Sequence, residues 1–197
     1  EEQLRALDDL VRQGKVLYVG VCNFQAWQVC RALWLQERLD AAPLIAVQNP
    51  YSLLNRELEA EMFPLVRELG LGIMAYAPLG TGLLSGAYAP GQPPPPGSLW
   101  SERRGRHLDL MLAGPAGAVL RVAQDVAARS GGTVAQVALR WVMSHPEITC
   151  AISGADTDAQ MDENLGAVDL EIGDADMARL DDVSRGLAIP LDGPQFA

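Results

Sequence analysis

Cysteine is scarce in this sequence, and the shortage argues against two kinds of stabilised scaffold. Only Cys22, Cys30 and Cys150 are present, and no two of them form a CxxC pair. An odd number at this spacing argues against a disulfide framework and a structural zinc site, so we expect no metal site. We expect all three to be buried free thiols in a reducing cytoplasm.

The sequence also has few positively charged residues and no long apolar run. Lys and Arg number 15 against 25 Asp and Glu, which gives a formal net charge of −10. An acidic chain without a basic run is repelled by nucleic acid and by anionic membrane surfaces. No apolar run approaches the ~20 residues that cross a bilayer, and no signal peptide is visible. The composition therefore predicts a cytoplasmic protein with neither a nucleic-acid nor a membrane partner.

What the sequence does contain is a regular alternation of helical and strand patterns. Helical spacing of apolar residues covers 4–13, 27–39, 57–69, 118–129, 133–144, 158–165 and 174–184. Short apolar runs occupy 16–21, 44–48, 72–77 and 149–153. Short links between alternating elements predict a parallel sheet, whose strands we expect to be buried on both faces.

Capping signals mark several of these helix ends. Asn55 and Gly70 flank the predicted helix 57–69. Thr133 precedes Gln136 by three residues, and Thr157 precedes Gln160 by the same interval, which is the spacing of a capping box.

Two segments depart from the alternation. From about Gly80 to Gly117 the chain is rich in Gly and Pro, with four consecutive prolines at 93–96. We expect no strand or long helix there but a functional loop, or alternatively an interdomain linker. The tail 186–197 is expected to be frayed. The chain also opens inside a helical pattern without Met, so we expect it to be part of a longer protein.

The number of predicted strands limits the fold. Four βα units cannot close a (β/α)8 barrel, which needs eight strands. An open dinucleotide-binding sheet would carry a GxGxxG turn after its first strand. The run Gly20–Phe24 does not fit that pattern, and Gly80-Thr81-Gly82 lacks its remainder.

Four segments at predicted strand ends resemble the aldo-keto reductase family. They are Gly20–Phe24, Val47–Arg56, Gly72–Gly80, and Ala151–Ala155 together with Gln160–Leu165. The likeness covers nearly the whole chain, in family order. It implies an α/β fold: the C-terminal half of a (β/α)8 TIM barrel, with four βα units and extra C-terminal helices, as one partial barrel domain over 1–197. It also implies NAD(P)H-dependent reduction of a small aldehyde or ketone substrate.

The resemblance assigns cofactor contacts to these strand ends. Asn23 and Gln48 would hydrogen-bond the nicotinamide carboxamide, because each side chain offers a donor and an acceptor, and Tyr76 would stack on the ring. Backbone N–H groups of Leu79–Leu83 would meet the pyrophosphate, and the helix start near Thr157 would face the adenosine phosphate. The implied cofactor-binding set is Cys22, Asn23, Gln48, Tyr76, Ala77, Pro78, Leu79, Gly80, Gly82, Leu83, Ile152, Gly154, Asp156, Thr157, and, toward the adenine, Gln160, Glu163 and Asn164.

Each assignment has a purely structural alternative. Asn23 could cap the following helix, Gln48 could close a turn, and Tyr76 could be a core aromatic. Glu163 and Asn164 could form a solvated helix face.

The sequence also departs from the family pattern near the cofactor. Cys22 stands where the family has Ser, and Ala77 where it commonly has Ser. Many members carry Lys or Arg at the positions of Gly154 or Asp156, where the cation pairs with a 2′-phosphate. A carboxylate there would repel that phosphate, so both NADPH and NADH remain candidate cofactors.

The resemblance implies no catalytic residue in this chain. The family's catalytic Asp, Tyr, Lys and His lie on the first four strands, and neither His107 nor His145 matches them. The expected partner is the N-terminal half of the barrel. Two alternatives remain: a non-catalytic binding or regulatory protein on this scaffold, as in the potassium-channel β subunits, or a half-barrel that self-associates through its strand edges.

Overall fold

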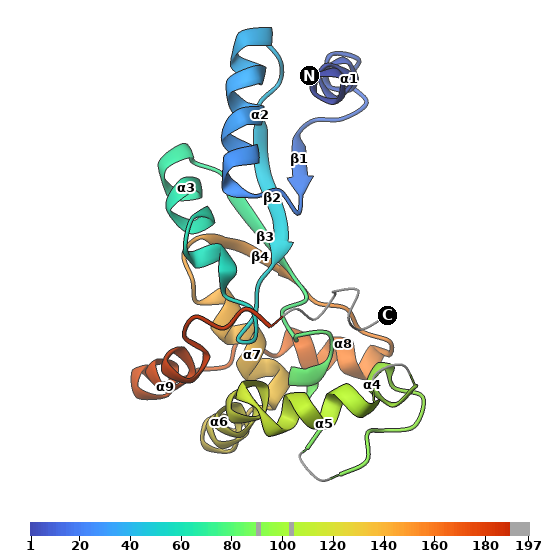
Figure 1. Cartoon of the computed structure of the whole chain (residues 1–197), viewed down its shortest axis with the longest axis vertical. Helices are drawn as coiled ribbons and strands as arrows, with labels where there is room; N and C mark the ends of the chain where they lie inside the picture. Colours follow the sequence, from blue (N-terminus) through green and yellow to red (C-terminus); the bar gives the residue numbers. More distant parts are fainter. Residues whose placement is uncertain (90–91, 103–104, 190–197) are drawn as a thin grey trace.

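An open parallel sheet forms the centre of the molecule (Figure 1). The computed structural model describes residues 1–89, 92–102 and 105–189, without the side chains of residues 99, 102 and 105–107. The four strands lie in sequence order: β1 Val19–Cys22, β2 Leu44–Pro50, β3 Gly72–Tyr76 and β4 Ile148–Ile152. All three pairings are parallel. The strands make half of an eight-stranded barrel, which confirms the predicted fold.

The predicted helices form close to their expected bounds. They are α1 Glu2–Arg12, α2 Ala26–Leu39, α3 Met62–Leu69, α6 Pro115–Ser130, α7 Val134–Met143, α8 Asp158–Leu165 and α9 Asp174–Ser184. Thr133 and Gln136 form the predicted capping box at α7, with N···O distances of 3.0 and 3.2 Å. The predicted helix 57–69 is divided into the short turn η1 Glu57–Glu59 and α3.

The segment from Gly80 to Gly117, which was expected to be a loop without a strand or a long helix, contains short helices. It holds the short turn η2 Leu83–Ser85, α4 Leu99–Glu102, α5 Gly105–Ala113 and the start of α6. Leu108 and Leu112 are four residues apart and buried, so α5 buries one apolar face. A Cβ at Gly117 would collide with the carbonyl oxygen of Leu112. This glycine therefore allows the start of α6 to pack directly on the end of α5.

The sheet is covered on one face only, which corrects the expectation of strands buried on both faces. Val47, Ile73 and Ala75 are fully buried on the helix side. The opposite face carries a row in mutual register, Cys22, Gln48, Met74 and Cys150. This face is open because the described helices all lie on the other side or beyond the strand ends (Figure 1).

The cysteines are free, but the expectation that they are buried is wrong. Cys22, Cys30 and Cys150 are all exposed. Cys22 and Cys150 lie on the open face of the sheet, and Cys30 lies on α2. The thiols are exposed because no described segment covers the surfaces on which they lie. A thiol is apolar enough to be buried where a neighbouring segment does cover it.

The segment after α9 is ordered as far as Ile189, which corrects the expectation of a frayed tail for that stretch. The backbone N–H of Arg56 donates to Leu187 O at 2.7 Å, and the N–H of Ile189 donates to Leu54 O at 2.9 Å. Residues 190–197 lie outside the described part of the chain. Within the described residues, no helix combines the length and apolar character needed to span a bilayer.

Candidate functional site

The carboxyl ends of β1, β2 and β3 bring four of the predicted residues together. Cys22 lies opposite Gln48 in the parallel register, and its Sγ lies 3.5 Å from Gln48 Oε1. The Asn23 N–H donates to Gln48 O at 2.9 Å. Tyr76 Oη donates to Asn23 Oδ1 at 2.9 Å, joining β3 to β1 across β2. Three amide or hydroxyl side chains therefore converge at one edge of the sheet.

Two residues at this edge have a left-handed backbone. Asn23 has φ 58° and Ala77 has φ 51°, each directly after the last residue of its strand. For a residue with a Cβ this conformation costs of the order of 1 kcal/mol, although Asn tolerates it better than Ala. Such strain is concentrated at functional sites, because the surrounding structure must hold the residue in place.

Asn49 supports this edge and was not among the residues predicted from the sequence. Its side chain is only 7 % exposed, and its Nδ2 donates to Phe24 O at 3.2 Å. The bond anchors the loop that carries Asn23. The sequence signal was the Gln48-Asn49-Pro50 cluster at a strand end, of which only Gln48 was assigned a role.

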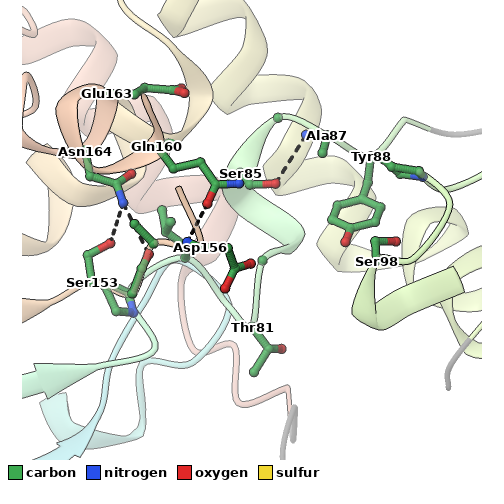
Figure 2. Close-up of a pocket in the computed structure, with 18 of the residues that line it drawn as sticks. Thr81, Ser85, Ala87, Tyr88, Ser98, Ser153, Asp156, Gln160, Glu163 and Asn164 are labelled. Carbon is green, nitrogen blue, oxygen red and sulfur yellow. Dashed lines mark hydrogen bonds between the residues drawn. The ribbon is translucent and has the colours of Figure 1, made fainter. Parts of the chain in front are cut away.

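A cavity of about 990 Å³ opens beside Tyr76, at the ends of β3 and β4. Ile152 lines the cavity and pairs with Tyr76 in register, so the cavity adjoins the strand ends that carry Asn23 and Gln48. Figure 2 shows Asp156 and Gln160 on one side of the cavity, and Tyr88 and Ser98 on the other. The volume is within the range of small-molecule and cofactor sites.

The cavity brings together most of the remaining predicted residues. Those that line it are Ala77, Pro78, Leu79, Gly82, Ile152, Gly154, Asp156, Gln160, Glu163 and Asn164. Gly80, Leu83 and Thr157 are not in the lining. The Leu83 side chain is 2 % exposed and belongs to the hydrophobic core, so its backbone alone could face a ligand.

Several loop amides predicted to meet a pyrophosphate already donate within the loop. The N–H of Gly80 donates to Ala77 O at 2.9 Å, and that of Gly82 to Leu79 O at 3.1 Å. The N–H of Leu83 donates to Gly80 O at 3.2 Å. Gly80 and Gly82 have φ values of 57° and 89°, which this tight turn requires.

Two polar side chains of α8 hold the loop between β4 and α8. Asn164 Nδ2 donates to Ser153 Oγ at 3.0 Å and to Gly154 O at 3.3 Å. Gln160 Oε1 accepts from the Asp156 N–H at 2.7 Å (Figure 2). Asn164 is 9 % exposed, so the alternative of a solvated helix face does not describe it.

Five hydroxyl-bearing residues to which the sequence gave no site role line the cavity: Thr81, Ser85, Tyr88, Ser98 and Ser153. Ser98 Oγ is buried and has no hydrogen-bond partner among the described residues. A buried hydroxyl without a partner is costly, and a bound phosphate or ribose oxygen would satisfy it. The sequence could not predict that Ser98 lines the cavity, because only the tertiary fold brings residues 95–98 next to the ends of β3 and β4.

The charges of the cavity are unusual for a site that binds an anion. Asp156 and Glu163 line it, and the described lining includes no Lys or Arg. The start of α8 offers its helix dipole instead, with Thr157 Oγ1 accepting from the Gln160 N–H at 3.2 Å. The cavity therefore offers hydroxyl and amide groups to a ligand, but its described lining offers no cation to a phosphate.

His145 and Tyr51, which lie outside the cavity, have structural roles. His145 Nδ1 lies 2.9 Å from Trp141 O, and its ring packs edge-on against Trp141. Tyr51 is fully buried and donates to Glu59 Oε1 at 2.6 Å. Burial first, and the Glu59 carboxylate second, raise the pKa of Tyr51 far above its usual range. Neither residue lines the cavity, and the side chain of His107 lies outside the described part of the structure.

The comparisons with known proteins agree with this geometry. The model of the aldo/keto reductase family matches residues 1–185. An uncharacterized oxidoreductase YrpG of Bacillus subtilis is 32% identical over 186 residues, covering 94% of this chain and 54% of its own length.

Two further relatives are named as a channel subunit and as a reductase. A probable voltage-gated potassium channel subunit beta of Oryza sativa is 30% identical over 171 residues, with 86% of this chain and 52% of the relative covered. An NADH-specific methylglyoxal reductase of Escherichia coli is 28% identical over 192 residues, with 94% and 54% covered. The chain thus spans about half the length of the curated relatives it matches. The family model covers nearly all of the described residues, and the chain belongs to the aldo/keto reductase family.

Proposed function

We propose that this chain binds a nicotinamide dinucleotide across its strand ends, as part of an oxidoreductase that reduces aldehydes or ketones. The observation that carries the proposal is the continuity of the site. The Asn23–Tyr76 bond leads through the Tyr76–Ile152 register pair into the 990 Å³ cavity. A ring-bearing head group and a diphosphate tail need such a continuous, extended site.

The strand-end residues would hold the nicotinamide end. When bound, the cofactor supplies the hydride that reduces the carbonyl carbon. Asn23 and Gln48 would pair with the carboxamide, and the Tyr76–Asn23 hydrogen bond would be exchanged for one to the ligand. Tyr76 would then lie against the ring. The resemblance to the family assigns the proton donor for the carbonyl oxygen to the other half of the barrel, so reduction would require that half.

We further propose that the preferred cofactor is NADH. The 2′-phosphate of NADPH would enter a cavity with two carboxylates and, among its described residues, no basic side chain. Uncompensated repulsion between Asp156 and that phosphate would weaken NADPH binding. The relative named as an NADH-specific methylglyoxal reductase is consistent with this preference.

Titration of the chain with NADH and NADPH, followed by nicotinamide fluorescence, tests both proposals. We expect tighter binding of NADH. The substitution Asp156→Arg should improve the NADPH:NADH affinity ratio by about tenfold, because it replaces repulsion with an ion pair. Asp162→Arg, on the exposed side of α8 and outside the cavity lining, makes the same change of charge and should leave the ratio unchanged.

Two results would contradict these proposals separately. If neither cofactor binds the chain or a longer protein that includes the upstream half, the cofactor site is wrong. If both bind and Asp156→Arg leaves the ratio unchanged, the NADH preference is wrong while the site stands. Tight binding without carbonyl reduction by the longer protein would favour the regulatory alternative, which the relative named as a potassium channel subunit represents.

A further inference from the structure

An exposed stripe of alternating tryptophan and arginine runs along α2. Trp27, Arg31, Trp34 and Arg38 follow one another at intervals of four, three and four residues, which brings all four to one side of the helix. The two Trp side chains are 56% and 53% exposed, and both arginines are exposed. We call these four residues the Trp/Arg stripe. Trp and Arg are the residues most enriched in the energetic centres of protein interfaces.

The stripe lies on the side of α2 that faces away from the rest of the protein. Val29, Ala32 and Gln36 are the buried residues of α2, and they occupy the opposite side of the helix, which packs on the rest of the protein. Figure 1 shows α2 along an outer side of the molecule. Pairing of the open sheet face with another half-barrel would therefore leave the stripe exposed.

The chemistry of the stripe is that of cation–π pairing. The Arg38 guanidinium lies 4.8 Å from the centroid of the Trp34 ring within the chain. Trp27 Nε1 donates to Gln25 Oε1 at 2.5 Å, so its one polar atom is satisfied while its ring remains mostly exposed. An exposed ring of this kind gains most from a cation over its face that is removed from water at the same time.

The order of the four residues is self-complementary when one copy is reversed. Consider a two-fold axis that crosses α2 midway between Arg31 and Trp34, with a second copy running antiparallel. Rotation about that axis sets Trp27 opposite Arg38 of the second copy, and Arg31 opposite Trp34 of the second copy. Every Trp then meets an Arg, and no arginine meets an arginine. An isologous interface requires this kind of match between a surface and itself.

We propose that two copies of this chain associate through antiparallel pairing of their α2 helices, with Trp27–Arg38 and Arg31–Trp34 contacts made twice across a two-fold axis. The proposal is independent of the cofactor site. The contact is narrow, and interfaces well below the standard size are weak, so we expect a dissociation constant on the order of 100 μM.

Sedimentation velocity of the full chain over a range of concentrations tests the pairing. The wild type should shift from a species of 21.1 kDa toward one of twice that mass. Trp27→Arg sets arginine against Arg38 of the second copy and should weaken association by at least tenfold. The exchange variant Trp27→Arg/Arg38→Trp restores a Trp opposite each Arg in the antiparallel register, and it should recover most of the lost affinity.

Controls separate this pairing from association through the strand edges. Arg121→Glu changes an exposed arginine on α6 and should leave association as in the wild type. Circular dichroism of each variant checks that the fold is kept. A wild type that stays monomeric up to about 1 mM overturns the proposal. So does a Trp27→Arg variant that associates like the wild type, or an exchange variant that remains as weak as the single one.

Discussion

At the scale of single residues, Asn23 combines a left-handed backbone with a side-chain hydrogen bond at the strand end. Its backbone is left-handed with φ 58°, and its Oδ1 accepts from Tyr76 Oη. Glycine would satisfy the first demand alone, and alanine would satisfy neither. Asn is the residue type that tolerates this backbone while keeping an amide at the strand end.

Substitutions at Asn23 should therefore separate stability from binding. We expect Asn23→Gly to stay within about 1 kcal/mol of the wild-type free energy of unfolding, and Asn23→Ala to lose about 1–2 kcal/mol. Both should weaken NADH binding, because both lack the carboxamide partner. Urea denaturation and cofactor titration measure the two effects. Wild-type NADH affinity in Asn23→Gly would remove Asn23 from the proposed site.

Sequence reasoning identified residues at this scale better than it identified what they do. The polar residues at strand ends stood out, and the structure brings Asn23, Gln48 and Tyr76 together. The sequence did not reveal that the side chains of Gln160 and Asn164 are hydrogen-bonded to the loop between β4 and α8. A side chain's partner depends on distances between segments, which a residue's type does not encode.

At the scale of elements, two glycines in the sheet allow close neighbours. A Cβ at Gly20 would lie 2.9 Å from the backbone oxygen of Ala46, and one at Gly72 would lie 2.8 Å from Thr149 Oγ1. The first obstacle is part of the β1–β2 ladder and cannot move without disturbing it. The second is the end of a side chain that can rotate.

We expect these glycines to differ in their response to the same substitution. Gly20→Ala should lower the free energy of unfolding by about 1–3 kcal/mol, since it wedges β1 away from β2. Gly72→Ala should cost less, because Thr149 can change rotamer. Urea denaturation of the two variants side by side measures the difference. Equal losses would mean that the Gly20–Ala46 approach does not limit the β1–β2 pairing.

The helices inside the Gly/Pro-rich segment show where local signals failed at this scale. Composition predicted a loop, yet α5 forms and buries Leu108 and Leu112. Tertiary packing of an amphipathic face supplies most of the stability of a short helix, so a poor local background does not exclude one. By contrast, a capping box depends on local contacts, and the one predicted at Thr133 and Gln136 formed. At α8 only the Thr157 half formed, because Gln160 Oε1 accepts from the Asp156 N–H instead.

At the scale of the whole molecule, Arg56 joins distant parts of the chain. Its guanidinium donates to Glu59 at 2.6 and 2.9 Å, and to Asp181 O and Ser184 Oγ of α9 at 2.8 and 2.9 Å. Its side chain is 8% exposed. The group therefore ties the loop after β2 to the last helix.

This tie predicts a dependence of stability on pH. Burial raises the pKa of Glu59, but hydrogen bonds from Arg56 and Tyr51 outweigh it, so the pKa lies below its usual 4.5. A carboxylate with a lowered pKa stabilises the fold above pH 4.5, and that stabilisation is lost as the pH falls through the folded-state value.

Comparison with Glu59→Gln should reveal the effect. The variant should be less stable than the wild type at pH 7, and the difference should shrink as the pH falls below 4.5. Glu57→Gln, an exposed neighbour on η1, should show no such trend. Urea denaturation at a series of pH values measures both variants. A difference for Glu59→Gln that stays constant with pH would contradict the linkage.

The sequence by itself determined the order of the four strands and of the helices outside 80–114, several helix caps, and which polar residues stand at the strand ends. These depend on periodicity and on short-range hydrogen bonding, which act within a few residues. Only the tertiary structure decided that one face of the sheet and all three cysteines are exposed, that Ser98 returns to the cavity, and that Arg56 reaches α9. Burial and pairing depend on which distant segment covers a residue, and no local pattern carries that information.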